Sequence, residues 1–192
     1  MRRNAFIRFF VDTRAFILYD KGQMIQVYTG NGKGKTTAAL GQAFRALGHG
    51  KRVFLIQFMK KGRGLGELKA ARRFNKFEIL QSGRAGWVKK GKASLKDKQL
   101  AQEGLSFARK AIEKKRFDLI ILDELNVAVA FGLVKARQVK EILKDSPKDL
   151  EIVITGRGIH PEILKIADLV SDIKELKHYY KKGITARRGI EY

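Results

Sequence analysis

The chain contains no cysteine and only 2 prolines in its 192 residues. The lack of cysteine excludes disulfide bonds, thiolate metal sites and thiol nucleophiles. No apolar run approaches the ~20 residues that a membrane span requires. The basic and apolar start hints at a signal peptide, but Arg8, Asp12 and Arg14 interrupt it and no small-residue cleavage pattern follows. These absences favour a cytoplasmic location and predict no membrane attachment.

Acidic residues are also scarce. The chain has 19 Asp and Glu against 41 Lys and Arg, which gives a formal net charge of +22. Such an excess attracts anionic partners: nucleic acid, anionic lipid, an acidic protein or a polyphosphate. Because the charges are scattered along the chain, the alternative is a lysine-rich, solvated surface of the kind found in heat-stable proteins.

Short apolar runs alternate with longer amphipathic stretches. The runs predict strands at 24–29, 53–58, 77–80, 119–122 and 152–154, and helical spacing predicts helices at 35–47 and 95–115, with weaker ones at 66–74, 135–143 and 161–167. Strands that are apolar almost throughout are buried on both faces, as in a parallel sheet covered by helices. The sequence therefore predicts an α/β three-layer fold with a mostly parallel central sheet.

The first predicted strand begins at Met24, so a single domain is expected at 24–192. Residues 1–23 form an N-terminal extension before it. One interpretation places the natural start of the protein at Met24, with residues 1–23 an extension of uncertain status. The alternative is that the extension forms an additional strand or an arm that packs on a partner subunit.

A glycine- and lysine-rich segment joins the first predicted strand to the first predicted helix. It reads Thr29-Gly30-Asn31-Gly32-Lys33-Gly34-Lys35-Thr36-Thr37. Glycine allows a backbone to wrap around phosphate oxygens, and the helix adds unpaired N–H groups and the positive end of its dipole. In this pattern Lys35 places a positive charge on the phosphates and the Thr36 hydroxyl ligates Mg²⁺. Residues 30–37 are therefore predicted to bind ATP, although Thr29 replaces the first glycine of the usual G-x-x-x-x-G-K-[ST] pattern.

Two carboxylates, Asp123 and Glu124, directly follow the apolar run at 119–122. A buried parallel strand delivers such residues to the carboxyl edge of the sheet, where ligands bind. P-loop enzymes use an acid there to hold Mg²⁺ directly or through water. At least one of the two is predicted to serve a metal ion; the alternative is that they end the strand and cap the next helix.

Arg157 lies in the turn Thr155-Gly156-Arg157-Gly158, which follows another apolar run. A guanidinium group pairs bidentately with phosphate. Arg157 is predicted to contact the triphosphate, unless it is a surface arginine in a glycine turn.

Trp87 is the only tryptophan, and glycines and lysines surround it. This composition predicts a mobile loop that carries an aromatic group to a planar ligand. The alternative is a loop tryptophan packed on the domain surface.

Taken in order, these residues resemble the P-loop ATP:corrinoid adenosyltransferases of cobalamin metabolism. The resemblance rests on Ile25 to Ala39, Arg45 to Lys51, Gln57-Phe58, Gly66-Glu67, Leu122 to Leu125, Ile154 to Arg157, Ala167 to Val170, Lys177-His178, Gly183-Ile184 and Gly189 to Tyr192. It thus covers nearly the whole chain from Met24 onward, which makes it far more specific than a phosphate-binding loop alone.

The resemblance implies transfer of the 5′-deoxyadenosyl group of ATP to the cobalt(I) of a reduced corrinoid, cobalamin or cobyrinic acid a,c-diamide, with release of triphosphate. It also implies a RecA-like fold, a homodimer, Mg²⁺ or Mn²⁺, and ATP bound in the reverse sense to most P-loop enzymes. Lys35 corresponds to the family's phosphate-binding lysine, and Thr36 and Glu124 correspond to its metal ligands. The excess of basic residues, rather than the resemblance, favours an acidic flavoprotein as the reductant, and neither nucleic acid nor a membrane is expected as a partner.

Since cobalt(I) is itself the nucleophile, this reaction requires no activated Ser, Cys or His. Lys35 and Arg157 would neutralise the departing triphosphate, and Trp87 would help to keep the lower ligand off cobalt. Some family members carry an aromatic-x-aromatic pair for that task. Here Ala85 and Lys89 stand two positions from Trp87, so its correspondence to either member of the pair stays open.

Three other functions use similar loops. A small-molecule kinase would need a base, for which Glu67 is a candidate. A RecA-like nucleic-acid motor would suit the positive charge, but no aromatic-basic recognition motif is present. A non-catalytic nucleotide switch would turn over little ATP.

Overall fold

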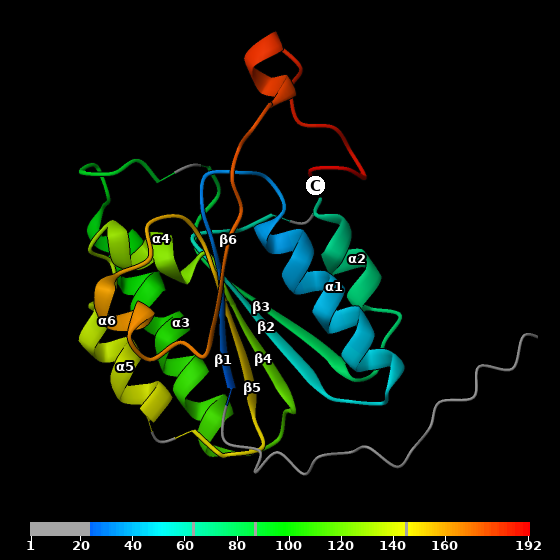
Figure 1. Ribbon diagram of the computed structural model, residues 1–192, viewed down its shortest axis with the longest axis vertical. Coiled ribbons are helices and arrows are strands. Elements are labelled where there is room, and N and C mark those ends of the chain that lie inside the picture. Colours follow the sequence, from blue (N-terminus) through cyan, green and yellow to red (C-terminus); the bar gives the residue numbers. More distant parts are fainter. Residues whose placement is uncertain (1–23, 63, 87, 145) are drawn as a thin grey trace, which may run out of the picture.

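The computed structural model describes residues 24–62, 64–86, 88–144 and 146–192. Its centre is a six-stranded sheet in the order β3-β2-β4-β5-β1-β6. The strands are β1 Met24–Thr29, β2 Val53–Phe58, β3 Phe77–Ser82, β4 Leu119–Asp123, β5 Glu151–Thr155 and β6 Leu169–Asp172. Every pair of neighbours is parallel, so the carboxyl ends of all six strands meet at one edge (Figure 1).

Helices cover both faces of this sheet (Figure 1). On one face lie α1 Lys35–Gly48 and α2 Gly66–Ala71. On the other lie α3 Leu95–Glu113, α4 Leu125–Ala130, α5 Ala136–Lys144 and α6 Pro161–Leu164. The α/β three-layer fold and its parallel sheet are thereby confirmed, as expected of a RecA-like P-loop fold.

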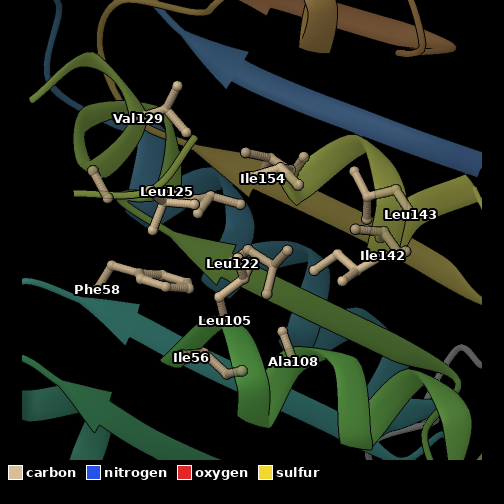
Figure 2. Packing of buried hydrophobic residues seen from close by; sticks show 14 of the residues in the cluster. Ile56, Phe58, Leu105, Ala108, Leu122, Leu125, Val129, Ile142, Leu143 and Ile154 are labelled. Carbon is tan, nitrogen blue, oxygen red and sulfur yellow. The ribbon is translucent and has the colours of Figure 1, made fainter. Parts of the chain in front are cut away.

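The central strands send alternate side chains to two separate hydrophobic clusters. Residues such as Ile121 and Val153 pack with Ala39 and Ala43 of α1. Figure 2 shows the opposite cluster, in which Ile56, Leu122 and Ile154 face the side chains of α3, α4 and α5. Because β4 is buried at all five positions, it holds its last residue, Asp123, in place and positions Glu124 directly after it.

Three described elements were not predicted: β6, α4 and the 3₁₀ helix η1 Tyr179–Lys182. β6 is exposed at all four positions and reads Leu-Val-Ser-Asp. It therefore has no continuous apolar run of the kind that marks the inner strands. α4 is only six residues long, too short for helical periodicity to be recognised. The predicted helices at 66–74 and 161–167 are present but end earlier, at Ala71 and Leu164.

After β6 the chain rises above the carboxyl edge and forms the 3₁₀ helix η1 Tyr179–Lys182. It then returns so that its end lies above the tops of α1 and α2 (Figure 1). Glu191 anchors this return, since it accepts hydrogen bonds from Tyr179 and from the Arg187 backbone. Residues 173–192, called here the C-terminal segment, thus form one wall of the carboxyl edge.

Candidate active site at the carboxyl edge

The phosphate-binding loop connects β1 to α1 at this edge. Gly34 is the N-cap residue of α1. No side-chain cap accepts a hydrogen bond from the N–H groups of the first turn, and the turn contains no acidic residue. The N–H groups of that turn are therefore available to an anion, and the helix dipole favours one there.

The loop glycines are needed for two different reasons. Gly34 has a φ of +123° with no atom near its ideal Cβ position, so its backbone conformation alone demands glycine. Gly32 lies against the C-terminal segment: its N–H donates to the Ile173 carbonyl at 2.7 Å. A Cβ on Gly32 would stand 2.7 Å from the carbonyl oxygens of Ile173 and Lys174. Glycine at position 32 thus serves the packing of the loop on the chain after β6.

Lys35 is buried in the curve of this loop. Its ammonium donates to the Gly32 carbonyl at 2.5 Å. Burial lowers the pKa of Lys35, and Arg157 lowers it further, whereas Glu124, Asp123 and Asp172 oppose the shift. A bound phosphate would oppose the lowering of this pKa, because its negative charge stabilises the protonated ammonium.

Asp123 is the most enclosed acid of the site, with none of its surface exposed. One carboxylate oxygen, Oδ1, accepts from the hydroxyls of Thr36 at 2.8 Å and Thr155 at 2.7 Å. The other, Oδ2, accepts from the ammonium of Lys60 at 2.7 Å. Asp123 therefore links β4 to the phosphate loop, β5 and the chain after β2.

Glu124 is only partly buried and has a left-handed backbone, with φ +61°. Its N–H donates to Thr155 Oγ1 at 3.0 Å, which holds this unfavourable conformation. Burial raises the pKa of Glu124, and Asp123 adds to the shift, while Lys60, Lys35 and Arg157 oppose it. Backbone strain of this kind costs ~1–3 kcal/mol and is concentrated at functional sites.

Arg157 is exposed and lies across the mouth of the loop. Its guanidinium donates to the Asn31 carbonyl at 3.2 Å. The buried Asn126 holds the turn from behind, since its amide donates to the Gly156 carbonyl at 3.1 Å. Gly156, at φ +124°, has Asn126 Cβ only 3.1 Å from its ideal Cβ position, so a larger residue would be strained here and would crowd Asn126.

The structure brings most of the predicted residues together. Lys35, Thr36, Asp123, Glu124 and Arg157 all meet at the carboxyl edge, with the loop residues Gly30 to Gly34 beside them. Thr37 is exposed on the first turn of α1. Trp87 lies outside the described residues.

A cavity of about 580 Å³ opens between the loop and the C-terminal segment. Its lining includes Arg157, Lys174 and Lys181 together with Asp172 and Glu175; Gly30 and Asn31 complete it. The sequence patterns did not reveal this wall, because Lys174 and Lys181 are two of many lysines and β6 carries no apolar signal.

The oxygen donors of the site suit a hard divalent cation. The described residues contain no group of three or more His, Cys, Asp and Glu side chains that could hold a metal. Thr36 and Glu124 could still take part, since Mg²⁺ is commonly bound by one or two carboxylates together with substrate phosphates and water. In the part of the chain that the structure describes, no helix has the length and apolarity to cross a membrane.

Known proteins are similar to this sequence over nearly its full length. The family described as ATP:corrinoid adenosyltransferase BtuR/CobO/CobP matches residues 21–192. The corrinoid adenosyltransferase of Escherichia coli K12 is 37% identical, over 95% of this chain and 92% of its own. Corrinoid adenosyltransferase CobA of Salmonella typhimurium is 34% identical over the same shares. A corrinoid adenosyltransferase of Pseudomonas aeruginosa is 32% identical over 95% of this chain and 90% of its own. Alignments of that extent reach into the residues before Met24.

Proposed function

The chain belongs to the ATP:corrinoid adenosyltransferase family, and we propose that it transfers the 5′-deoxyadenosyl group of ATP to the cobalt(I) of a corrinoid. The Co–C5′ bond forms as the C5′–O bond breaks, and the oxygen leaves with triphosphate. The observation that carries the proposal is that the matched span, residues 21–192, contains every group of the carboxyl-edge site.

The protein's main task in this reaction is to stabilise the leaving triphosphate. Lys35, the N–H groups of the first turn of α1 and Arg157 present positive charge to one region at the sheet edge. Because these donors are held before substrate binds, they need little reorganisation as negative charge develops on the leaving oxygen. Cobalt(I) supplies the electron pair, so no side chain has to act as a base.

We propose that Thr36 and Glu124 hold a Mg²⁺ or Mn²⁺ ion bound to the triphosphate. Such an ion supplies positive charge that stabilises the departing phosphate oxygens. Thr36 suits this role because its hydroxyl hydrogen is committed to Asp123, which leaves its oxygen lone pairs available. Glu124 suits it because it is the less enclosed of the two acids.

The corrinoid would approach from the carboxyl edge, where the loop that follows β3 begins. Arg84 in that loop is fixed by an ion pair with Asp97 at 2.6 Å. Trp87 stands three residues farther on. We propose that Trp87 contacts the corrinoid and helps to exclude the lower ligand of cobalt.

Several expectations from the sequence accompany this proposal. They are a homodimer, an acidic flavoprotein as electron donor, a cytoplasmic location, and an N-terminal extension at 1–23 ahead of a domain at 24–192. The net charge of +22 supports an acidic donor.

A kinase is the second candidate, since a phosphate loop with Lys and Thr also serves phosphoryl transfer. The specific observation in its favour is that the charge of Glu67 acts on Lys60, which places its carboxylate near the site. The products separate the two reactions. With ATP, Mg²⁺ and chemically reduced cob(I)alamin, phosphorus NMR should show inorganic triphosphate for adenosyl transfer. ADP as the product would support a kinase instead.

A further inference from the structure

Lys60 is a basic residue with no assigned role in the proposed adenosyl transfer. It follows β2 and is largely enclosed, with 30% of its side chain exposed. Its ammonium contacts the fully buried Asp123 at 2.7 Å. Burial lowers the pKa of Lys60, but the charge and hydrogen bond of Asp123, with Glu124 and Glu67, raise it overall. Lys60 is therefore held as a cation inside the acidic part of the site.

The backbone around Lys60 is fixed from several directions. Met59, just before it, adopts a left-handed conformation with φ +57°, and its N–H donates to the Ser82 carbonyl at 2.9 Å. Gly83 packs so closely that a Cβ there would lie 2.4 Å from the backbone nitrogen of Lys60. A strained residue and a required glycine thus combine to aim Lys60 at Asp123.

The chain after Lys60 is held by a relay of amide side chains. The Gly62 N–H donates to Gln81, Gln81 donates to Gln57, and Gln57 donates to Glu67, each over 2.9–3.0 Å. Since Gln57 is fully buried, this relay ties the segment to the interior of β2 and β3. Lys60 is therefore fixed on both sides.

The contacts of Asp123 decide what this cation does. Both carboxylate oxygens already accept hydrogen bonds, Oδ1 from two hydroxyls and Oδ2 from Lys60. Two hydroxyls occupy Oδ1, and an ion that reached Oδ2 would lie next to the positive charge of Lys60. Glu124 is under no such constraint in the described structure.

We propose that Lys60 is a positioning residue, a built-in counter-ion that reserves Asp123 as acceptor for Thr36 and Thr155 and leaves Glu124 as the single carboxylate for the metal. This inference rests on the proposed function, because it assumes a divalent ion beside Thr36. One free carboxylate suits an ion that keeps most of its water and binds chiefly through substrate phosphates.

The test measures Mn²⁺ binding alone, without nucleotide, from the electron paramagnetic resonance signal of the free ion. The variants are Lys60→Met, the double variant Lys60→Met/Asp123→Asn, and Lys61→Met, an exposed neighbour, as matched control. Lys60→Met removes a positive charge next to the ion, so Mn²⁺ should bind at least about fivefold more tightly than to the parent protein. The double variant restores the charge balance and should return to within about twofold of the parent, as should Lys61→Met.

If the ion pair between Lys60 and Asp123 only stabilises the fold, Lys60→Met should not tighten Mn²⁺ binding. Unchanged, weaker or undetectable Mn²⁺ binding by Lys60→Met would overturn the inference, and so would a double variant as tight as the single one. If circular dichroism shows Lys60→Met unfolded, Lys60→Gln removes the charge but keeps a donor for Asp123, and the same tightening is expected. Failure of the proposed function is recognised separately, because the parent protein would then form no Co–C bond whatever its Mn²⁺ affinity.

Discussion

The Thr36 hydroxyl donates to Asp123 Oδ1 at 2.8 Å, although the two residues are 87 positions apart in the sequence. This hydrogen bond joins the first turn of α1 to the end of β4 and orients the threonine oxygen. It also supports the proposed division of tasks between neighbouring acids, in which Asp123 holds the hydroxyl and Glu124 serves the metal.

The first prediction compares these two acids. Glu124→Gln should reduce adenosyl transfer at least ~100-fold and raise the Mg²⁺ concentration that it requires, because the variant lacks the direct ligand. Asp123→Asn should have the smaller effect on Mg²⁺ dependence. It should instead destabilise the fold by about 3–5 kcal/mol, since it leaves the Lys60 charge without its buried partner. Mg²⁺ titrations of activity and denaturant unfolding measure both effects; the reverse ranking in Mg²⁺ dependence would make Asp123 the direct ligand.

The second prediction concerns the packing of the phosphate loop. Gly32→Ala places a methyl group 2.7 Å from two carbonyl oxygens, so the loop must move and ATP affinity should fall at least about tenfold. Gly41→Ala is the matched control, because Gly41 lies inside α1 with open space around its Cβ position. It should leave ATP affinity unchanged and stabilise the helix by ~0.5–1 kcal/mol. Calorimetry with ATP would contradict the account if Gly32→Ala bound as well as the control.

The third prediction concerns pH and the start of α3. The hydrogen bond from Arg84, with those from Ser94, outweighs burial and lowers the pKa of Asp97 from 3.8 to about 2. Asp97 therefore contributes stability that is fully present above pH 3.8 and is lost as pH falls through about 2. The difference in melting temperature between the parent and Asp97→Asn should be constant at neutral pH and narrow below pH 3.8. A difference that stays constant down to pH 2 would mean that the charge of Asp97 contributes nothing.

The fourth prediction concerns Trp87. If this residue keeps the lower ligand off cobalt, Trp87→Ala should cripple adenosylation that starts from cob(II)alamin and a mild reductant. Pre-formed cob(I)alamin has already shed that ligand, so its reaction should suffer much less. ATP affinity should barely change, because the phosphate loop lies on a different element. Equal losses from both starting states would indicate general corrinoid binding, and no loss from either would indicate a surface-packed residue.

Local features of the site were predictable from the sequence. The loop from Gly30 to Thr37 and the pair Asp123-Glu124 each follow a run of apolar residues. A parallel sheet brings such strand ends together at one edge, which is why Arg157 could be assigned to the same region.

The missing features depend on which strands are neighbours. Lys60 reaches Asp123 because β2 lies beside β4, and strand order cannot be read from apolar runs. The packing of Gly32 on Ile173 similarly requires β6 beside β1. Nothing local distinguishes Lys60 from the other lysines, so its role emerges only from the fold.

The central claim is that C5′ of ATP becomes bonded to cobalt at this site. The most direct measurement uses ATP labelled with ¹³C at C5′, incubated with Mg²⁺ and cob(I)alamin, with the corrinoid product examined by ¹³C NMR. Lys35→Ala, confirmed as folded by circular dichroism, serves as the inactive control. The account predicts that the parent protein places the label in a light-sensitive Co–C bond and that Lys35→Ala does not. A label that remains in ATP or appears in ADP, with the corrinoid unlabelled, would contradict it.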